Sequence, residues 1–156
     1  MRVLGIDPGT GRMGWAVVEK EKGVEKLLSC GCIETKPNTP LPERLELIFN
    51  QLNKIIKEQK PTKASIEDLF FANNQKTVIS VGAGRGVAIL ACQLAKLEIS
   101  SYTPLQVKHS LTGYGGADKK QVEYMVMQIL KLKEIKELDD TIDALALALT
   151  HLSHSR

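Results

Sequence analysis

The hydrophobic positions at the start of the chain fall in three short runs, separated by polar and turn-forming residues. The first run spans residues 2–7 and ends at Asp7, which opens the turn-rich sequence Asp-Pro-Gly-Thr-Gly. The second and third runs, residues 13–19 and 24–34, flank Lys22-Gly23, a pair typical of a hairpin turn. Three successive strands with short links predict an antiparallel meander.

The rest of the chain alternates between helical and strand patterns. Apolar residues recur at helical spacing between residues 45 and 56 and predict an amphipathic helix that ends before Pro61. We expect a strand at 63–67, a helix at about 74–96, a strand at 97–102 and a last helix at about 139–151. Between these, Asp118 and Gln121 resemble a capping box at the start of a further helix. This order predicts an α/β fold with a mixed sheet covered by helices.

Composition narrows the class of protein only slightly. The 156 residues, 43% hydrophobic and 25% charged, suit one globular domain over residues 1–156. The formal net charge of +3 permits a nucleic-acid partner without indicating one. No stretch approaches the roughly 18 apolar residues of a membrane helix, and Asp7 and Pro8 interrupt the first apolar run. Cys30, Cys32 and Cys92 lack zinc-like spacing, so we expect buried thiols in a cytoplasmic protein.

Acidic residues end several of the apolar segments. Asp7 ends the first predicted strand and Glu67 ends the fourth, so the two meet if these strands are neighbours. Asp140 and Asp143 are three residues apart, which puts them on one face of a helix with about 5–6 Å between their Cβ atoms. Asp139 lies four residues before Asp143 and can share that face. The rest of this helix is nearly all apolar, so its acidic first turns are expected near the rim of the core.

Converging carboxylates repel one another unless a cation compensates their charge. Hard oxygen ligands favour Mg²⁺, Mn²⁺ or Ca²⁺ over zinc, and two such ions about 3.5–4 Å apart can activate water for phosphodiester cleavage. A structural interpretation stays open at this point. Asp139 and Asp140 favour the start of a helix through its dipole, and Asp7-Pro8-Gly9 forms a reasonable turn by itself.

The segment Gly82-Ala-Gly-Arg-Gly86 invites a comparison with dinucleotide-binding loops. The fingerprint needs a preceding strand and a third glycine three residues after the second, whereas Val87 stands there and the segment lies inside a predicted helix. Small residues here instead permit close helix packing, within the chain or against a partner.

Six motifs in chain order resemble the RuvC family of Holliday junction resolvases and together span almost the whole chain. They are Gly5-Ile-Asp-Pro-Gly-Thr10, Ile66-Glu-Asp-Leu-Phe70, Ala83-Gly-Arg-Gly-Val-Ala88, Gln106-Val-Lys108, Ala117-Asp-Lys-Lys-Gln-Val122 and Asp140-Thr-Ile-Asp-Ala-Leu-Ala146 with Thr150-His151 after it. The resemblance implies a ribonuclease-H-like five-stranded sheet with helices on both faces. It also implies a homodimer that makes paired nicks in four-way junction DNA with Mg²⁺, which Mn²⁺ can replace. RuvA and RuvB, the branch-migration proteins, are the partners that it implies.

The resemblance also implies roles for individual residues. The four acids that match the catalytic set of the family are Asp7, Glu67, Asp140 and Asp143. The positions that match DNA-binding residues are Phe70, an aromatic that touches unpaired bases, and Lys108 and Lys119, beside the scissile phosphates. Lys120 joins them as an expected DNA contact, in a lysine-rich segment. Asp68 departs from the family pattern, since an uncharged residue often follows the catalytic Glu.

Three other functions compete with this prediction. An actin-like sugar kinase or ATPase shares the opening strand and Asp, but it needs a second nucleotide-binding half for which 156 residues are too few. The related nucleases of RNA maturation fit Phe70 and the lysines less well. A junction-binding module without catalysis is disfavoured because all four acids are present. Nicking of a synthetic junction, beside ATP and single-stranded RNA controls, separates the four.

Overall fold

The computed structural model describes residues 1–68, 75–133 and 139–155. Its elements in chain order are β1 (Arg2–Asp7), β2 (Arg12–Glu21), β3 (Val24–Glu34), α1 (Leu41–Gln59), β4 (Lys63–Glu67), α2 (Gln75–Leu94), β5 (Glu98–Tyr102), α3 (Pro104–Thr112), α4 (Lys119–Leu130) and α5 (Asp139–His154). The strands form one sheet in the order β3-β2-β1-β4-β5. Strands β1, β2 and β3 are antiparallel, while β4 and β5 run parallel to β1. The predicted mixed sheet and the predicted meander are therefore confirmed.

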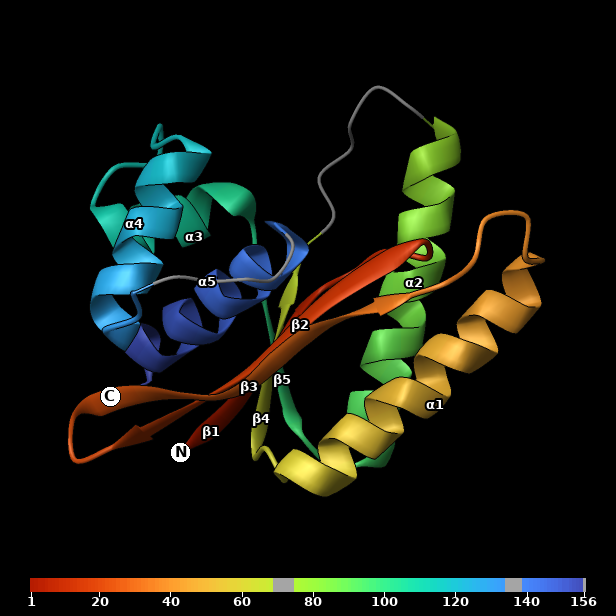
Figure 1. The fold of residues 1–156 in the computed structure, drawn as a ribbon, viewed down its shortest axis with the longest axis horizontal. Helices are drawn as coiled ribbons and strands as arrows, with labels where there is room; N and C mark the ends of the chain where they lie inside the picture. Colours follow the sequence, from red (N-terminus) through yellow and green to blue (C-terminus); the bar gives the residue numbers. More distant parts are fainter. Residues whose placement is uncertain (69–74, 134–138, 156) are drawn as a thin grey trace.

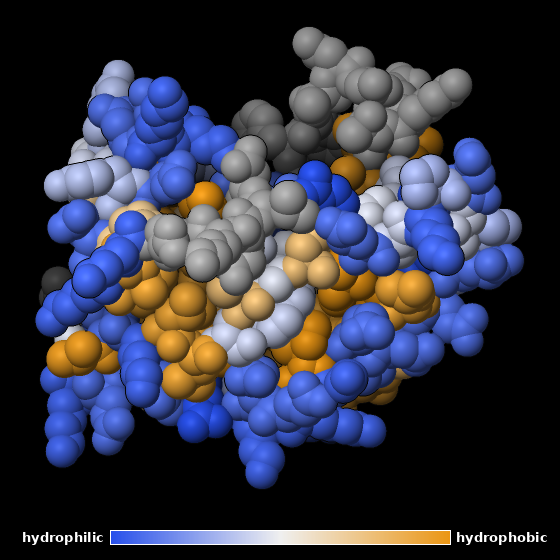
Figure 2. Space-filling view, in the orientation of Figure 1, coloured by the Kyte–Doolittle hydropathy of each residue, from blue (hydrophilic) through white to orange (hydrophobic). Residues whose placement is uncertain are grey.

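The sheet separates two hydrophobic cores because side chains alternate between its faces. On β1, Val3 packs with α3, α4 and α5 on one face, whereas Leu4 and Ile6 pack with α1 and α2 on the other. Figure 1 shows these two groups of helices on either side of the sheet. Strand β3 forms one edge of the sheet and is largely half-buried, and hydrophobic residues reach the surface on both sides of it (Figure 2).

Helix α5 lies directly on the sheet, and glycines in the strands permit the close approach. A Cβ atom on Gly5 would come within 2.0 Å of the backbone oxygen of Ala144, and one on Gly14 within 2.0 Å of that of Asp140. Helix α5 is therefore held across β1 and β2 by backbone contact. This packing fixes the first turns of α5 beside the C-terminal end of β1.

The sequence pattern did not predict α3, a helix of 9 residues. It begins at a capping box in which Thr103 and Gln106 bond each other's backbone N–H groups. A second capping box, from Asp118 and Gln121, starts α4 as predicted. None of the helices within the described residues is long and apolar enough to cross a membrane.

Candidate active site

Two of the predicted acids lie at neighbouring strand ends. Strands β1 and β4 pair in parallel, with Ile6 opposite Ile66, so the next residues, Asp7 and Glu67, leave the sheet at the same edge. Both side chains are half-buried, and their carboxyl groups are hydrogen-bonded to each other. A hydrogen bond between two carboxyl groups requires one proton, so this pair holds a proton where a cation can otherwise bind.

Helix α5 brings the other two acids to the same place. Asp140 and Asp143 lie in its first turns, and both raise the pKa of Asp7 by charge repulsion. The charge of Asp143 raises the pKa of Glu67 as well. The structure thus brings together the four acids, which come from β1, β4 and α5.

Burial and repulsion both shift the protonation of this cluster. Burial, followed by the charges of Glu67, Asp143 and Asp140, raises the pKa of Asp7 from 3.8 to about 8, against a smaller lowering by Lys119. Burial and then Asp143 raise the pKa of Glu67, and the hydrogen bond from Asp7 lowers it. At neutral pH the metal-free site therefore holds a proton on Asp7.

The donor set fits a hard divalent cation. All four side chains present carboxylate oxygens, the ligands that Mg²⁺ and Mn²⁺ prefer. A cation would replace the proton of the Asp7–Glu67 pair and relieve the repulsion that raises the pKa of Asp7. Among the described residues, no three His, Cys, Asp or Glu side chains are close enough together to hold a metal ion as they stand. The fit to a cation therefore rests on the type and charge of the donor atoms.

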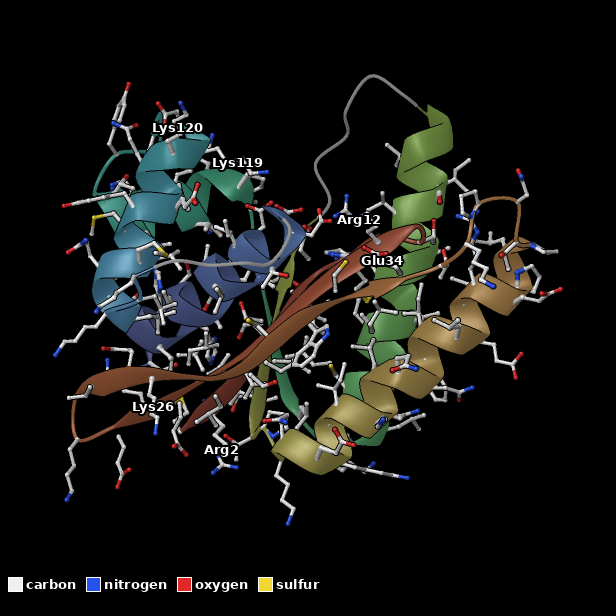
Figure 3. All side chains as sticks on the ribbon, viewed as in Figure 1. Arg2, Arg12, Lys26, Glu34, Lys119 and Lys120 are labelled. Carbon is white, nitrogen blue, oxygen red and sulfur yellow. The ribbon has the colours of Figure 1, made fainter. Side chains whose placement is uncertain are left out.

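Basic side chains line one wall of the cleft. A hollow of about 220 Å³ is bounded by Glu67, Asp143, Lys108 and Lys119, with apolar residues of α3, α4 and α5 behind them. The Lys119 Nζ lies 3.6 Å from the Asp143 Oδ2. Lys120, the next residue on α4, instead lines a separate hollow with Thr112, Asp118, Gln121, Tyr124 and Met125 (Figure 3). Lys108 and Lys119 thus share a cleft with Glu67 and Asp143, whereas Lys120 lines another hollow.

The expected aromatic contact, Phe70, lies outside the described residues. Asp68, which precedes this segment, forms an ion pair of 3.3 Å with Arg85 of α2. The Arg85 Nε also donates to the backbone oxygen of Glu67 at 3.0 Å, and its Nη2 donates to the Ser101 Oγ at 2.8 Å. Arg85 therefore ties the ends of β4 and β5 to α2, directly beside Glu67.

Sequence reasoning missed two arginines at this site. Besides Arg85, Arg12 at the start of β2 places its Nε 3.2 Å from the Asp140 Oδ2. Neither contact leaves a local signal in the sequence, because the partners are far apart in the chain.

The glycines of α2 differ in their surroundings. A Cβ on Gly84 would meet the Gly9 backbone oxygen at 2.9 Å, so this glycine packs within the chain, whereas Gly86 faces open space.

A five-stranded mixed sheet with helices on both faces, and acids gathered at the end of its central strands, is the arrangement of a ribonuclease-H-like nuclease. The sequence model of the family described as crossover junction endodeoxyribonuclease RuvC matches residues 3–151. The chain therefore belongs to the RuvC family of endonucleases.

Individual relatives agree over nearly the full length. The crossover junction endodeoxyribonuclease RuvC of Finegoldia magna is 46% identical over 156 residues, covering 100% of this chain and 95% of its own. That of Roseiflexus is 47% identical over 150 residues, covering 96% and 89%. The structure of Thermus thermophilus RuvC in complex with a Holliday junction substrate matches with a TM-score of 0.94 at 35% identity, covering 100% of this chain and 95% of that one.

Proposed function

We propose that this endonuclease resolves Holliday junctions at the cleft where Asp7, Glu67, Asp140 and Asp143 meet. The convergence of four acids from three separate elements, beside Lys108 and Lys119, carries this proposal. A purely structural role does not account for the group, because repulsion within it works against folding. We further propose that residues 1–156 act as one nuclease domain.

The proposed cofactor is Mg²⁺, with Mn²⁺ as a substitute. When bound by carboxylates, such ions lower the pKa of a water nucleophile and stabilise the charge on the leaving oxygen. The residues of the chain supply the remaining functions. On metal binding, Asp7 and Glu67 would release their shared proton to solvent, Asp140 and Asp143 would add two further carboxylate ligands, and Lys108 and Lys119 would bind the phosphodiester. Asp143 also keeps Lys119 close to the cluster until DNA arrives.

Resolution requires two nicks in strands related by twofold symmetry, so we propose a homodimer with one cleft per chain. Helix α2 offers the surface. Ile79, Gly86 and Leu90 lie within about 40° of one another on one face of this helix. Ile79, Leu90 and Leu94 are 70%, 51% and 60% exposed, which is a large apolar stripe to leave in water. Helix α2 also packs against the β1–β2 turn, so a dimer formed here is coupled mechanically to the site.

Junction DNA is the proposed substrate, and the resemblance extends the proposal to RuvA and RuvB as cytoplasmic partners. The first experiment incubates the protein with a synthetic four-way junction, a matched linear duplex and single-stranded RNA, each with Mg²⁺ or EDTA. We expect paired nicks in the junction alone and only with the metal. Cutting of duplex or RNA at the same rate would contradict the assignment. ATP hydrolysis by the same sample would support the kinase alternative instead.

Mixing wild-type chains with Asp7→Asn chains tests the dimer. Heterodimers should nick one strand and leave the opposing strand intact. If sedimentation finds monomers only, with and without junction, the paired-nick mechanism fails while the site assignment stands.

A further inference from the structure

Arg12 lies on the side of the acids that faces away from the lysines. Its Nε is 3.2 Å from the Asp140 Oδ2 and 3.8 Å from the Glu34 Oε1 at the end of β3. The side chain is nevertheless 47% exposed. Figure 3 shows Arg12 and Lys119 on either side of the N-terminal end of α5. The acids of α5 therefore have a basic group on both sides, although the sequence motifs drew attention to only one.

The two basic groups are held in a similar way. Lys119 is 3.6 Å from Asp143, and its side chain is 55% exposed. Both ion pairs are longer than the 2.7–2.9 Å that is typical of strong charge-assisted hydrogen bonds. Exposed pairs of this kind contribute little to stability, so either basic group can leave its acid at small cost.

The backbone of Arg12 is fixed in the sheet, whereas its half-exposed side chain can exchange one partner for another. Arg12 pairs with Glu34 in the β2–β3 register. Two residues further along β2, Gly14 permits the contact with the backbone oxygen of Asp140. The guanidinium therefore stays within one side-chain length of Asp140 whichever group it binds.

We propose that Arg12 contacts a DNA phosphate, and that its ion pair with Asp140 prevents this contact until a metal ion binds at the carboxylates. This inference rests on the proposed function. A divalent cation on Asp140 removes the attraction for Arg12 and repels its guanidinium. A phosphodiester bound beside that cation lies within reach of the released group, which matches phosphate with two parallel N–H donors. DNA is then held from both sides of the acids, by Arg12 on β2 and by Lys119 on α4.

The test compares junction affinity in EDTA and in Ca²⁺, an oxygen-binding substitute for Mg²⁺, with cutting monitored in the same samples. Arg12→Ala should raise the Kd by about 5-fold in Ca²⁺ and reduce the slope of log K against log salt by about 1. In EDTA the two proteins should bind alike. Arg12→Lys should keep most of the salt slope, because an ammonium group binds phosphate as a point charge.

Two control variants separate the contact from general charge effects. Arg2→Ala removes an arginine of similar exposure that pairs with Glu19 at 2.8 Å, at the opposite end of the sheet (Figure 3). Glu34→Gln removes the second acid beside Arg12 and leaves Asp140 intact. Neither should weaken junction binding.

Three results would overturn the inference. Wild-type affinity of Arg12→Ala in Ca²⁺ would show that Arg12 does not touch DNA. Equal losses of junction affinity with and without metal would show that the contact between Arg12 and DNA does not depend on release from Asp140. A loss of Mn²⁺ affinity in the DNA-free variant, measured by calorimetry, would show that Arg12 orients Asp140 as a metal ligand instead. If the wild-type protein itself does not prefer a junction over duplex, the proposed function fails first.

Discussion

Replacing Asp7 with Asn should make the metal-free protein more stable, although it removes a proposed metal ligand. Burial and three neighbouring acids raise the pKa of Asp7 from 3.8 to about 8. Between these values the folded protein keeps a proton that the unfolded chain has released. The free energy of unfolding therefore falls as pH rises through this window. Asn has nearly the same shape and carries no proton to retain, so it avoids this loss.

The size of the gain follows from the pKa. Each pH unit within the window costs about 1.4 kcal/mol, and at pH 7 about three units have been crossed, which sets a limit of about 4 kcal/mol. Solvent in the open cleft screens roughly half of this, so we expect Asp7→Asn to add about 2 kcal/mol at pH 7. For a chain of this size that corresponds to a Tm higher by about 4–8 °C.

Urea and thermal unfolding in EDTA at pH 4, 5.5, 7 and 8 measure this effect. The gain should be near zero at pH 4 and grow steadily with pH. Asp118→Asn is the matched control, since Asn caps a helix as well as Asp does and Asp118 caps α4. With Mg²⁺ the wild-type protein should gain stability by mass action while Asp7→Asn gains less. A variant that is less stable than wild type at pH 7, or a gain that does not depend on pH, would refute the repulsion argument.

Further predictions concern the metal, the dimer and the crossover. Binding of Mn²⁺ at pH 7 should release about one proton, because Asp7 must ionise, and the affinity for Mn²⁺ should be higher at pH 8.5 than at pH 6.5. Calorimetry in buffers of different ionisation heat measures the number of protons released, and a value of zero would contradict the raised pKa of Asp7. Leu90→Glu should shift sedimentation toward monomer and abolish paired nicking, whereas an unchanged dimer would place the interface elsewhere. Phe70→Ala should slow cutting of an intact junction more than cutting of one already unpaired at the crossover; equal losses would exclude a role in holding bases open.

The strand ends and α5 could be predicted from the sequence because each carries a local signal. An acid that ends an apolar run, as Asp7 and Glu67 do, is visible without a structure. The fixed geometry of a helix places Asp140 and Asp143 on one face wherever the helix packs. The prediction that Asp7 and Glu67 meet was conditional on β1 and β4 being neighbours, and the parallel pairing of these strands meets that condition.

The contacts of the two arginines could not be predicted in the same way. Arg12 and Asp140 are far apart in the chain and meet only because Gly14 lets α5 lie against β2. Arg85 reaches Glu67 across the gap between a helix and a strand end. The place of Lys120 could not be inferred from its position next to Lys119 in the sequence either. Consecutive helical residues point about 100° apart, so a lysine next to Lys119 in sequence lines a different hollow.

Helix α3 was missed for a different reason. It has 9 residues and only two of them, Val107 and Leu111, are buried, so its apolar pattern is too short to stand out. The Thr-Pro-Leu-Gln sequence that begins it carries a capping box and a Pro in the first turn, which together are a usable signal. This helix supplies Lys108, so recognising its capping box in the sequence would have predicted the helix that forms one wall of the cleft.

The most direct test of the four-acid site is single-turnover cutting of a saturating four-way junction in Mg²⁺. Asp7→Asn, Glu67→Gln, Asp140→Asn and Asp143→Asn should each bind the junction and fail to cut it, because each loses one metal ligand with little change in shape. Asp139→Asn, the neighbouring acid on α5, should cut at close to the wild-type rate. Near-normal cutting by Asp7→Asn would contradict the central claim. A dead Asp139→Asn beside an active Asp140→Asn would show that α5 presents a different acid to the metal.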